Sequence, residues 1–460
     1  MTHKTLVIFT LASVIAMAMG LSLTAPEQTL SAAGTVTVTY TLVTGGDTGQ
    51  LVFVGVGGEI DGIVNPTLTA NPGDVVQVNL INGDGMLHDF VIDELNVKTE
   101  QFSEREAQTS VTFTADQMGE FVYYCSVPGH RQAGMWGTLV VGHAATESAE
   151  GADIIRNPMD VPTPIEQQAP QTVKVELVAE EVVGQLADGT TMTYFTFNGQ
   201  VPGPMLRVRV GDTVEVHFRN NTTSQFPHSV DFHAATGPGG GAVFSNLNPG
   251  EETMFSFKAL SPGLFVYHCA TPSVAHHIAS GMYGMILVEP EGGLVPVDHE
   301  FYVMQGEIYT EESYGTTGFV HFDHEKMLAE APEYFVFNGA AAGLTSETKA
   351  MHAQVGETVR LFFGVGGPNF TSSFHVIGEI MDRVYDQGSI TSAPLTDVQT
   401  TLVPPGGAAM IEFKLDVPGR FMLVDHALSR LERGLVAYLM VDGEADPTIF
   451  DGELTAGSGH

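Results

Sequence analysis

Cysteine and basic side chains are both scarce in this sequence. Its 460 residues include only two cysteines, Cys125 and Cys269, too few for the framework of several disulfides that holds small secreted domains together. Lysine and arginine together number 18 against 54 aspartates and glutamates, a formal net charge of −36. Because binding a polyanion requires a basic face, this balance excludes nucleic acid or an anionic membrane as the main partner.

Long apolar runs are absent from most of the chain, with one exception at the N-terminus. An apolar stretch runs from Leu6 to Leu23 behind Lys4, and the small residues Ser31-Ala32-Ala33 follow it. This pattern is typical of a signal peptide, which we place at residues 1–33. The alternative is an uncleaved membrane anchor, because the run approaches the ~20 residues that span a bilayer. Either segment predicts a periplasmic or other extracytoplasmic protein.

Helical periodicity is scarce too, and strand signals replace it. Short runs of valine, threonine, phenylalanine and tyrosine alternate with turns of glycine, proline and asparagine, the pattern of all-β sandwich domains. Three signatures each recur three times: a Gly-acid turn that opens an alternating strand, a strand that opens on glycine, and a terminal strand. Such a repeat predicts three tandem β-sandwich domains. The first signature spans residues 73–79, 211–217 and 356–362, the second 119–125, 263–269 and 419–425, and the third 135–141, 282–288 and 435–441.

The repeats define the domain boundaries that we expect. The three domains cover residues 34–143, 172–290 and 291–460. Residues 144–171 are polar and contain four prolines, so we expect a linker that cannot continue a sheet. The second boundary is marked only by the short sequence Glu289-Pro-Glu-Gly-Gly293, which predicts a tighter connection between the second and third domains.

The first repeat contains a set of metal-ligand residues. His88 comes from an early strand, and Cys125, His130 and Met135 follow at intervals of five on the closing loop. Two imidazoles, a thiolate and a weak thioether are the ligands of a blue-copper, or type 1, electron-transfer site. A buried cysteine or a gap-filling methionine would explain one such residue alone, but not all four types at these intervals.

The second repeat has the same four residue types, which predict a second type 1 copper site. They are His228, Cys269, His277 and Met282. His276 directly precedes His277, so the identity of the second histidine ligand stays open from the residues. The interval of five to Met282, the same as in the first repeat, favours His277.

Two further histidines of the second repeat indicate a different site. His268 precedes Cys269, and His233 lies five residues after His228. Because neighbouring strand residues point to opposite faces, both histidines face outward if Cys269 faces into its own sandwich. The first repeat has Tyr124 in place of His268, so it cannot build this outer site.

The third repeat lacks the type 1 ligands but keeps two histidines. Asp425 replaces the cysteine and Leu435 the methionine. His426 follows Asp425, and His375 follows the first signature at a distance similar to that of the histidines in the other repeats. His426 and the two outward histidines of the second repeat would make a metal site of three nitrogens. Its open fourth position would bind a small ligand.

Residues 172–445 resemble copper-containing nitrite reductase, and the N-terminal unit resembles a free-standing cupredoxin fused in front. The resemblance implies three tandem cupredoxin-like Greek-key β-sandwich domains, assembled as a homotrimer. The motifs that carry it are His-Ser-Val-Asp-Phe-His-Ala-Ala-Thr-Gly (228–237), Tyr-His-Cys-Ala (267–270), His-Ile-Ala-Ser-Gly-Met (277–282), Ser-Ser-Phe-His-Val-Ile-Gly (372–378) and Val-Asp-His (424–426).

The resemblance also implies a role for each site residue and a content of two type 1 coppers and one type 2 copper per chain. Asp231 and His375 match the proton-handling residues of the family, and Ile377 matches the apolar residue above the type 2 copper. Thr400 stands where some members have a glutamate, so we expect different hydrogen bonding around His375. The implied type 1 ligands are His228, Cys269, His277 and Met282, and the implied type 2 ligands are His233, His268 and His426 of a neighbouring subunit.

The implied activity is the dissimilatory reduction of nitrite to nitric oxide and water, which consumes one electron and two protons. Nitrite would take the open position of the type 2 copper, and the electron would arrive from the type 1 copper through the Cys269–His268 peptide. The implied donor is a cytochrome c or a small cupredoxin. Asp231 and His375 are groups whose pKa values proteins can adjust for proton delivery.

Two other functions compete with this interpretation. A multicopper oxidase of the laccase type needs eight histidines, usually in His-x-His pairs and a His-Cys-His sequence. Here Ala270 follows Cys269, and Asp231-Phe-His233 supplies only one histidine of a pair. A non-catalytic blue-copper electron carrier explains the first domain but leaves the outward histidines, Asp231 and His375 without a role.

Overall fold

The structure is a computed structural model that describes residues 36–45, 51–117, 119–131, 133–141, 151–166 and 169–452. The predicted signal segment and the first part of the predicted linker lie outside these residues. Strands dominate, and the α-helices have only four to six residues, so the all-β prediction is confirmed. Within these ranges no helix is long and apolar enough to cross a membrane.

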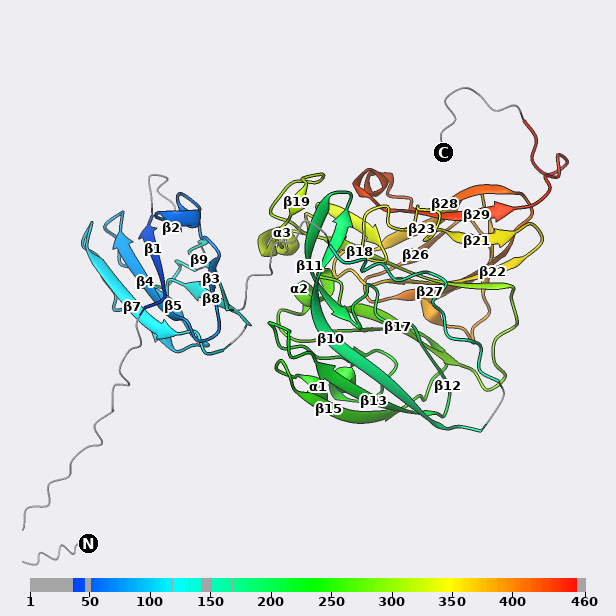
Figure 1. The fold of residues 1–460 in the computed structure, drawn as a ribbon, viewed down its shortest axis with the longest axis horizontal. Helices are drawn as coiled ribbons and strands as arrows, with labels where there is room; N and C mark the ends of the chain where they lie inside the picture. Colours follow the sequence, from blue (N-terminus) through cyan, green and yellow to red (C-terminus); the bar gives the residue numbers. More distant parts are fainter. Residues whose placement is uncertain are drawn as a thin grey trace, which may run out of the picture.

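The first domain is a two-sheet sandwich (Figure 1). Alternate residues of its central strand are buried, because one face packs against the other sheet while the other face meets solvent. The sheet of order β2-β1-β4-β7 contains β1 (Val38–Thr44), β2 (Phe53–Gly55), β4 (Val75–Asn82) and β7 (Gln108–Thr114); the sheet of order β3-β9-β8-β5-β6 contains β3 (Leu68–Ala70), β5 (Val91–Ile92), β6 (Val97–Lys98), β8 (Gly119–Tyr124) and β9 (Trp136–Val141).

The second domain repeats this arrangement, with one strand contributed from beyond residue 290. The short strand β19 pairs in parallel with β11, so the second sandwich borrows part of the segment that we assigned to the third. The sheet of order β15-β13-β10-β11-β19 contains β10 (Thr172–Ala187), β11 (Thr190–Phe197), β13 (Thr213–Asn220), β15 (Glu252–Lys258) and β19 (Gly318–Phe319); the sheet of order β12-β17-β16-β14 contains β12 (Leu206–Arg209), β14 (Asp231–Phe232), β16 (Gly263–His268) and β17 (Tyr283–Glu289).

The third domain is the largest sandwich, and its core is the most extensive apolar cluster of the described residues. The sheet of order β20-β18-β22-β27-β24-β25 contains β18 (His299–Ile308), β20 (Tyr334–Phe337), β22 (Thr358–Val365), β24 (Met381–Tyr385), β25 (Leu395–Val398) and β27 (Ala408–Lys414); the sheet of order β21-β29-β28-β23-β26 contains β21 (Met351–Gln354), β23 (Ser372–Ile377), β26 (Thr400–Val403), β28 (Gly419–Asp425) and β29 (Val436–Asp442).

The helices are short and lie in the connections between strands. Helix α2 lies between β16 and β17, on the loop that contains His277, and α3 packs against it. The α-helices are α1 (Ala242–Ser245), α2 (Val274–Ala279) and α3 (His324–Leu328), and the 3-10 helices are η2 (Gly58–Ile60), η3 (Pro238–Gly241), η4 (Asp386–Gly388) and η5 (Leu428–Arg433).

Residues 151–166, the described part of the predicted linker 144–171 before residue 167, correct that prediction. Ile154 is fully buried in the apolar cluster between the second and third domains. Ala152 and Ile155 form β-bridges with the second domain, and the Arg156 guanidinium donates to the Pro202 carbonyl at 2.8 Å. The prolines prevent a regular strand, but the two adjacent isoleucines provide enough apolar surface to bind this segment along the domain interface.

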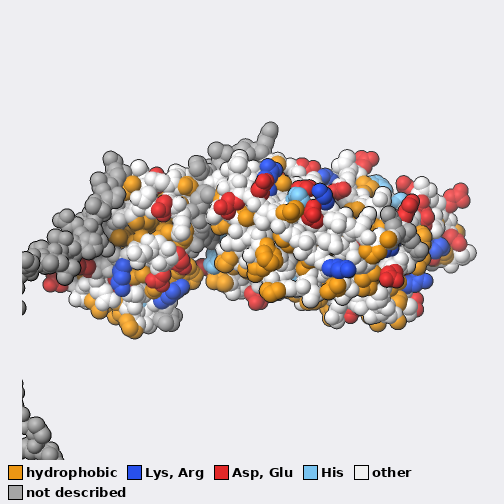
Figure 2. All heavy atoms as spheres, turned by 90° about the horizontal axis from the view of Figure 1, so that it is seen from below, with side chains coloured by type: hydrophobic (Ala, Val, Ile, Leu, Met, Phe, Trp, Pro, Cys, Tyr) orange, Lys and Arg blue, Asp and Glu red, His pale blue; other side chains and the backbone are white. Residues whose placement is uncertain are grey.

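A buried ion-pair network joins the second and third domains. Arg207 binds Glu289 at 2.5 Å within its own domain and Glu300 of the third domain at 2.6 Å. Glu300 also binds Arg360 at 2.8 Å, and Arg360 in turn binds Glu412 at 2.5 Å. Because each buried charge has a partner, the network fixes the relative position of the two sandwiches. On the face seen in Figure 2, acidic side chains are scattered rather than gathered in one patch.

Candidate functional site

Strand pairing aligns the three repeats residue by residue. In each domain, the residue before the cysteine position pairs with a residue of β5, β14 or β23. Counting three residues back from this pairing residue gives the position of the first metal ligand. That position is occupied by His88 in the first domain, His228 in the second and Ser372 in the third. His375 therefore occupies the position of Asp231, which corrects the alignment indicated by its distance from the first signature. The pairs are Val91–Tyr124, Asp231–His268 and His375–Val424.

The loops that close the domains align in the same way. In the first two domains the methionine N–H donates to the carbonyl of the second histidine, at 3.0 Å for Met135 and 3.2 Å for Met282. Leu435 makes the equivalent bond to the carbonyl of Arg430 at 3.1 Å. An arginine therefore stands in the third domain where the other two have the second histidine.

The structure brings together the predicted thiolate set of the first domain. The Cys125 Sγ lies 3.8 Å from the Nδ1 of His88 and 3.4 Å from the Nδ1 of His130. Cys125, His88 and Met135 are fully buried, and His130 is only 7% exposed. The Nε2 of His88 donates to the Asp84 carboxylate at 3.0 Å, which leaves Nδ1 free to bind a metal.

The second domain forms the same arrangement and identifies the second histidine. The Nδ1 of His277 lies 3.3 Å from the Cys269 Sγ and 3.2 Å from the Nδ1 of His228. The ring of His276 instead stacks on Phe322, with ring centroids 4.0 Å apart. Met282 is fully buried on the same loop.

The electrostatics of the two thiols differ. Burial raises the pKa of Cys125 above its ordinary value. Burial acts on Cys269 in the same direction, but hydrogen bonding and charge from His228 and backbone N–H groups outweigh it, so the pKa of Cys269 is lowered. Burial also lowers the pKa of His130, which keeps a neutral imidazole. A soft thiolate with two imidazoles suits copper, so the residues of both sets fit this metal.

Sequence patterns did not reveal the carboxylates behind these ligands. Glu181 in β10 accepts a hydrogen bond from the Nε2 of His228 at 2.7 Å, and it also accepts from the N–H groups of Gln225 and Phe226. It lies 47 residues from the histidine, without any local motif to link the two. Asp84 lies only four residues before His88, so its nearness in the sequence is a signal from which its role could be predicted.

The outward histidines of the second domain form a separate cluster with Asp231. The ligand atoms of Asp231, His233 and His268 lie within 4.8 Å of one another, and the two Nε2 atoms are 3.0 Å apart. The Nδ1 of His268 donates to the Cys269 carbonyl at 2.9 Å, which leaves Nε2 facing the cluster. Gly240 lies against the Asp231 carboxylate, where a Cβ would collide with it.

The ring of His233 is held from the third domain of the same chain. It is hydrogen bonded to the backbone of Gly406, and burial followed by the neighbouring His268 lowers its pKa. Burial and the neighbouring His268 favour the neutral imidazole of His233, and the hydrogen bond to Gly406 fixes the orientation of its ring; a neutral, oriented imidazole is the state that binds a metal.

The third domain contributes a second cluster, and the two clusters are not joined within one chain. The rings of His375 and His426 have centroids 5.5 Å apart, and the His375 Nδ1 donates to the Gln399 carbonyl at 2.6 Å. Thr400 lies opposite His375 in the strand register. His426 is exposed, and Ile377 is 37% exposed. In the described part of the chain, His426 is not among the residues gathered around His233.

At the position that the metal ligands occupy in the other two domains, the third domain has an ion pair. Arg430 pairs with the fully buried Asp425, which stands in place of the cysteine. The guanidinium also lies over the rings of Phe335 and Phe370, at 4.9 and 5.0 Å from their centroids. The arginine supplies internally the positive charge that a metal ion would supply in the other two domains.

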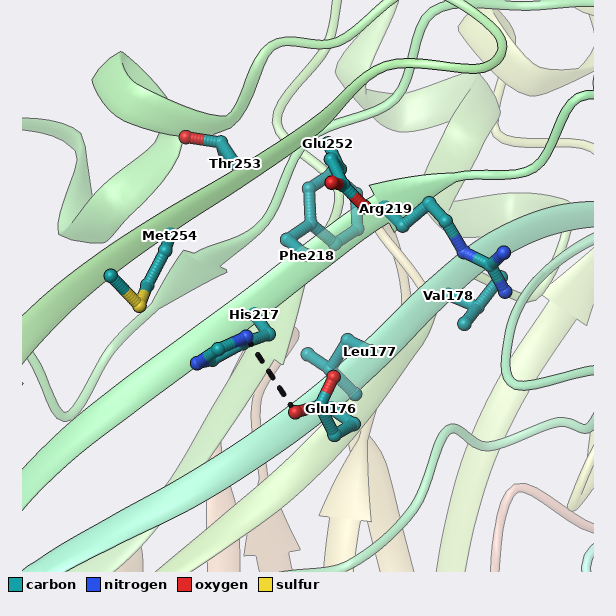
Figure 3. A pocket seen from close by; sticks show the side chains of 9 residues that line it. All are labelled: Glu176, Leu177, Val178, His217, Phe218, Arg219, Glu252, Thr253 and Met254. Atoms are coloured by element: carbon teal, nitrogen blue, oxygen red, sulfur yellow. Dashed lines mark ion pairs between the residues drawn. The ribbon is translucent and has the colours of Figure 1, made fainter.

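A shallow groove of about 470 Å³ on the outer face of the β10–β13–β15 sheet lies apart from these sites (Figure 3). His217 faces Glu176 across it at 3.7 Å, while Met254 and Arg219 lie along its sides. Its lining includes none of the predicted ligand residues.

Comparison with known proteins agrees with this geometry. Residues 62–142 match a family model described as copper binding proteins of the plastocyanin/azurin family, and residues 179–293 and 320–445 match models described as multicopper oxidase. The fold and the thiolate and histidine sets thus define a multidomain copper-binding oxidoreductase.

The relatives identify the family. A copper-containing nitrite reductase of Neisseria gonorrhoeae is 50% identical over 305 residues, which are 65% of this chain and 77% of that protein. One from Alcaligenes faecalis is 34% identical over 67% of this chain and 89% of that protein. The solved structure of the copper nitrite reductase from Nitrosomonas europaea is 35% identical, with a TM-score of 0.54 over 60% of this chain and 96% of that chain. The chain belongs to the copper-containing nitrite reductase family, as the sequence motifs predicted.

Proposed function

We propose that this chain reduces nitrite to nitric oxide and water outside the cytoplasm, using two type 1 coppers and one type 2 copper per chain. The observation that carries the proposal is the adjacency of Cys269 and His268. Cys269 belongs to a buried thiolate set, and His268 belongs to the outward cluster of histidines beside the Asp231 carboxylate. Copper, when bound, supplies one-electron transfer at the thiolate sets and an open position for nitrite at the outward histidines.

The residues of the chain orient the ligands and handle protons. Backbone carbonyls hold the Nδ1 atoms of His268 and His375, so the Nε2 atom of each ring is left to face the reaction. Asp231 and His375 occupy equivalent positions in the second and third domains. Asp231 lies beside His233 and His268, and His375 lies beside His426. This arrangement suits the delivery of two protons, one from each residue.

We propose a homotrimer in which the Asp231 cluster of one subunit meets the His426 cluster of the next. Both clusters are accessible in the single chain, and apolar side chains are exposed around each of them. Such patches are typical of protein–protein interfaces. The exposed apolar residues are Val243 and Phe244 beside the first cluster, and Ile377, Ile380 and Leu402 beside the second.

The proposal predicts three separable copper centres. We expect one copper for each thiolate set and one for the outward histidines, together with production of nitric oxide from nitrite. His268→Ala should remove the type 2 signal and the turnover but leave both blue centres, because His268 lies outside the thiolate sets. Metal analysis, electron paramagnetic resonance and nitric oxide detection test this. Two blue coppers with no type 2 signal in the unaltered protein would instead support an electron carrier.

We propose that the first domain passes electrons to the type 1 site at Cys269. Met86 and Leu87, directly before the ligand His88, are 48% and 42% exposed, which suits contact with a protein partner such as a cytochrome c or small cupredoxin. Cys125→Ala should then abolish most of the turnover with the physiological donor. Turnover driven by a small reductant that reaches the second domain directly should remain. An unchanged rate with the physiological donor would exclude the first domain from the pathway.

A further inference from the structure

The two thiolate sites differ at the residue that follows the first histidine ligand. This residue is Asp89 in the first domain and Ser229 in the second, at equivalent positions in the strand register. Ser229 directs its backbone N–H toward the Cys269 Sγ at 3.4 Å. The backbone of Asp89 is likewise hydrogen bonded to Cys125. The side chains differ: the Asp89 carboxylate accepts from the backbone N–H of Ser126, the residue after Cys125, at 2.6 Å. A buried acid therefore lies beside one thiolate and a neutral hydroxyl beside the other.

The contacts of Asp89 are those of a charged carboxylate. Its side chain is fully buried and accepts hydrogen bonds from the N–H and Oγ of Ser126, the latter at 2.5 Å, and from Gln101 Nε2 at 3.2 Å. It is also hydrogen bonded to the side chain of Cys125. The Lys98 ammonium lies 3.6 Å away, but its side chain is 56% exposed, so solvent weakens its compensation. A net negative charge therefore remains next to the metal position of the first domain.

The other acidic neighbours of the two sites match. Asp84 accepts from the outer nitrogen of His88 at 3.0 Å, and Glu181 accepts from that of His228 at 2.7 Å. Each first histidine thus has one carboxylate behind it, and Asp89 is the additional charge. Negative charge near a metal stabilises its more positive, oxidised state and so lowers its reduction potential.

We propose that Asp89 makes the copper site of the first domain the lower-potential of the two type 1 sites. One electron then passes downhill from the Cys125 site, which is oxidised, to the Cys269 site, which is reduced, and no proton or bond is exchanged. Asp89 acts through charge and is not itself a ligand. This inference rests on the proposed copper assignment and adds the direction of electron flow.

Spectroelectrochemical titration of the full-length protein tests the proposal, with each centre isolated by removal of the other thiolate. We expect the potential of the Cys269→Ser protein to lie below that of the Cys125→Ser protein. Adding Asp89→Asn to the Cys269→Ser protein should raise the potential of the first-domain site by about 59 mV or more, a tenfold shift in the one-electron equilibrium. Adding Ser229→Asp to the Cys125→Ser protein should lower the potential of the second-domain site.

Glu94→Gln, which removes an exposed acid from the same domain, is the matched control and should change the potential little. A blue centre whose potential is unchanged by Asp89→Asn would overturn the inference while leaving the proposed function intact. Absence of any blue absorption from the Cys269→Ser protein would overturn both the inference and the copper assignment of the first domain.

Discussion

Replacing Arg430 with methionine should lower the free energy of unfolding by about 3 kcal/mol, near the lower end of the range for breaking a buried ion pair. The change leaves Asp425 fully buried without its cationic partner. The carboxylate would keep its hydrogen bonds from the N–H groups of Ser373 and Ala427, which is why we expect the lower end. Chemical denaturation monitored by circular dichroism measures the effect.

The same change should also weaken the type 2 site, because Arg430 joins Asp425, at the turn that presents His426, to the Thr371 carbonyl at 2.8 Å. The N–H of His426 donates to the Ser373 carbonyl at 2.8 Å, next to the N–H that binds Asp425. We expect Arg430→Met to lose type 2 copper while both blue centres remain. Copper analysis separates this outcome from general unfolding.

Arg433 on the same 3-10 helix η5 provides the matched control. Its side chain is 43% exposed and its ion pair with Glu333 is 3.3 Å long, so Arg433→Met should cost less than about 1 kcal/mol. Equal losses of stability for the two variants would show that the position of Arg430, in place of a metal ligand, has no special importance.

Replacing Asp231 with asparagine should reduce nitrite turnover by roughly 10²–10⁴-fold, the contribution of a positioned acid or base. Asparagine has nearly the same shape, and Gly240 leaves room for it, so His233 and His268 should keep their positions. The variant should retain its type 2 copper and its blue centres.

Glu252→Gln removes a carboxylate from an exposed position on β15 of the same domain and serves as the control. It should leave turnover unchanged. If Asp231→Asn kept full turnover at normal copper content, Asp231 would have no part in proton delivery. If it lost type 2 copper instead, its role would be structural support of the histidines.

Local spacing explains why the thiolate sets could be predicted. Cys125, His130 and Met135 lie on one closing loop, so their intervals in the sequence are nearly their relations in space. The exclusion of His276 was different. Spacing only favoured His277, and the choice depends on a ring contact with Phe322, which comes from another domain.

Composition misled the linker prediction for the part of residues 144–171 around Ile154. Prolines and polar side chains indicated a free linker, yet Ile154 is buried between two domains and Arg156 is hydrogen bonded beneath it. The two isoleucines Ile154 and Ile155 contribute little to the average composition of this polar stretch. Once they contact a complementary apolar surface, however, their burial stabilises the packing of the segment.

The sequence by itself determined the residue types of the metal sets, the threefold repetition of the strand signatures and the family, because these depend on motifs within a few consecutive residues. Only the tertiary structure decided which groups support them. Glu181 reaches His228 across 47 positions, and Ser372 rather than His375 proves equivalent to the first histidine. The pairing of Arg430 with Asp425 also appears only once the loop is folded. Strand register and packing between distant segments create these relations, and neither leaves a periodic pattern along the chain.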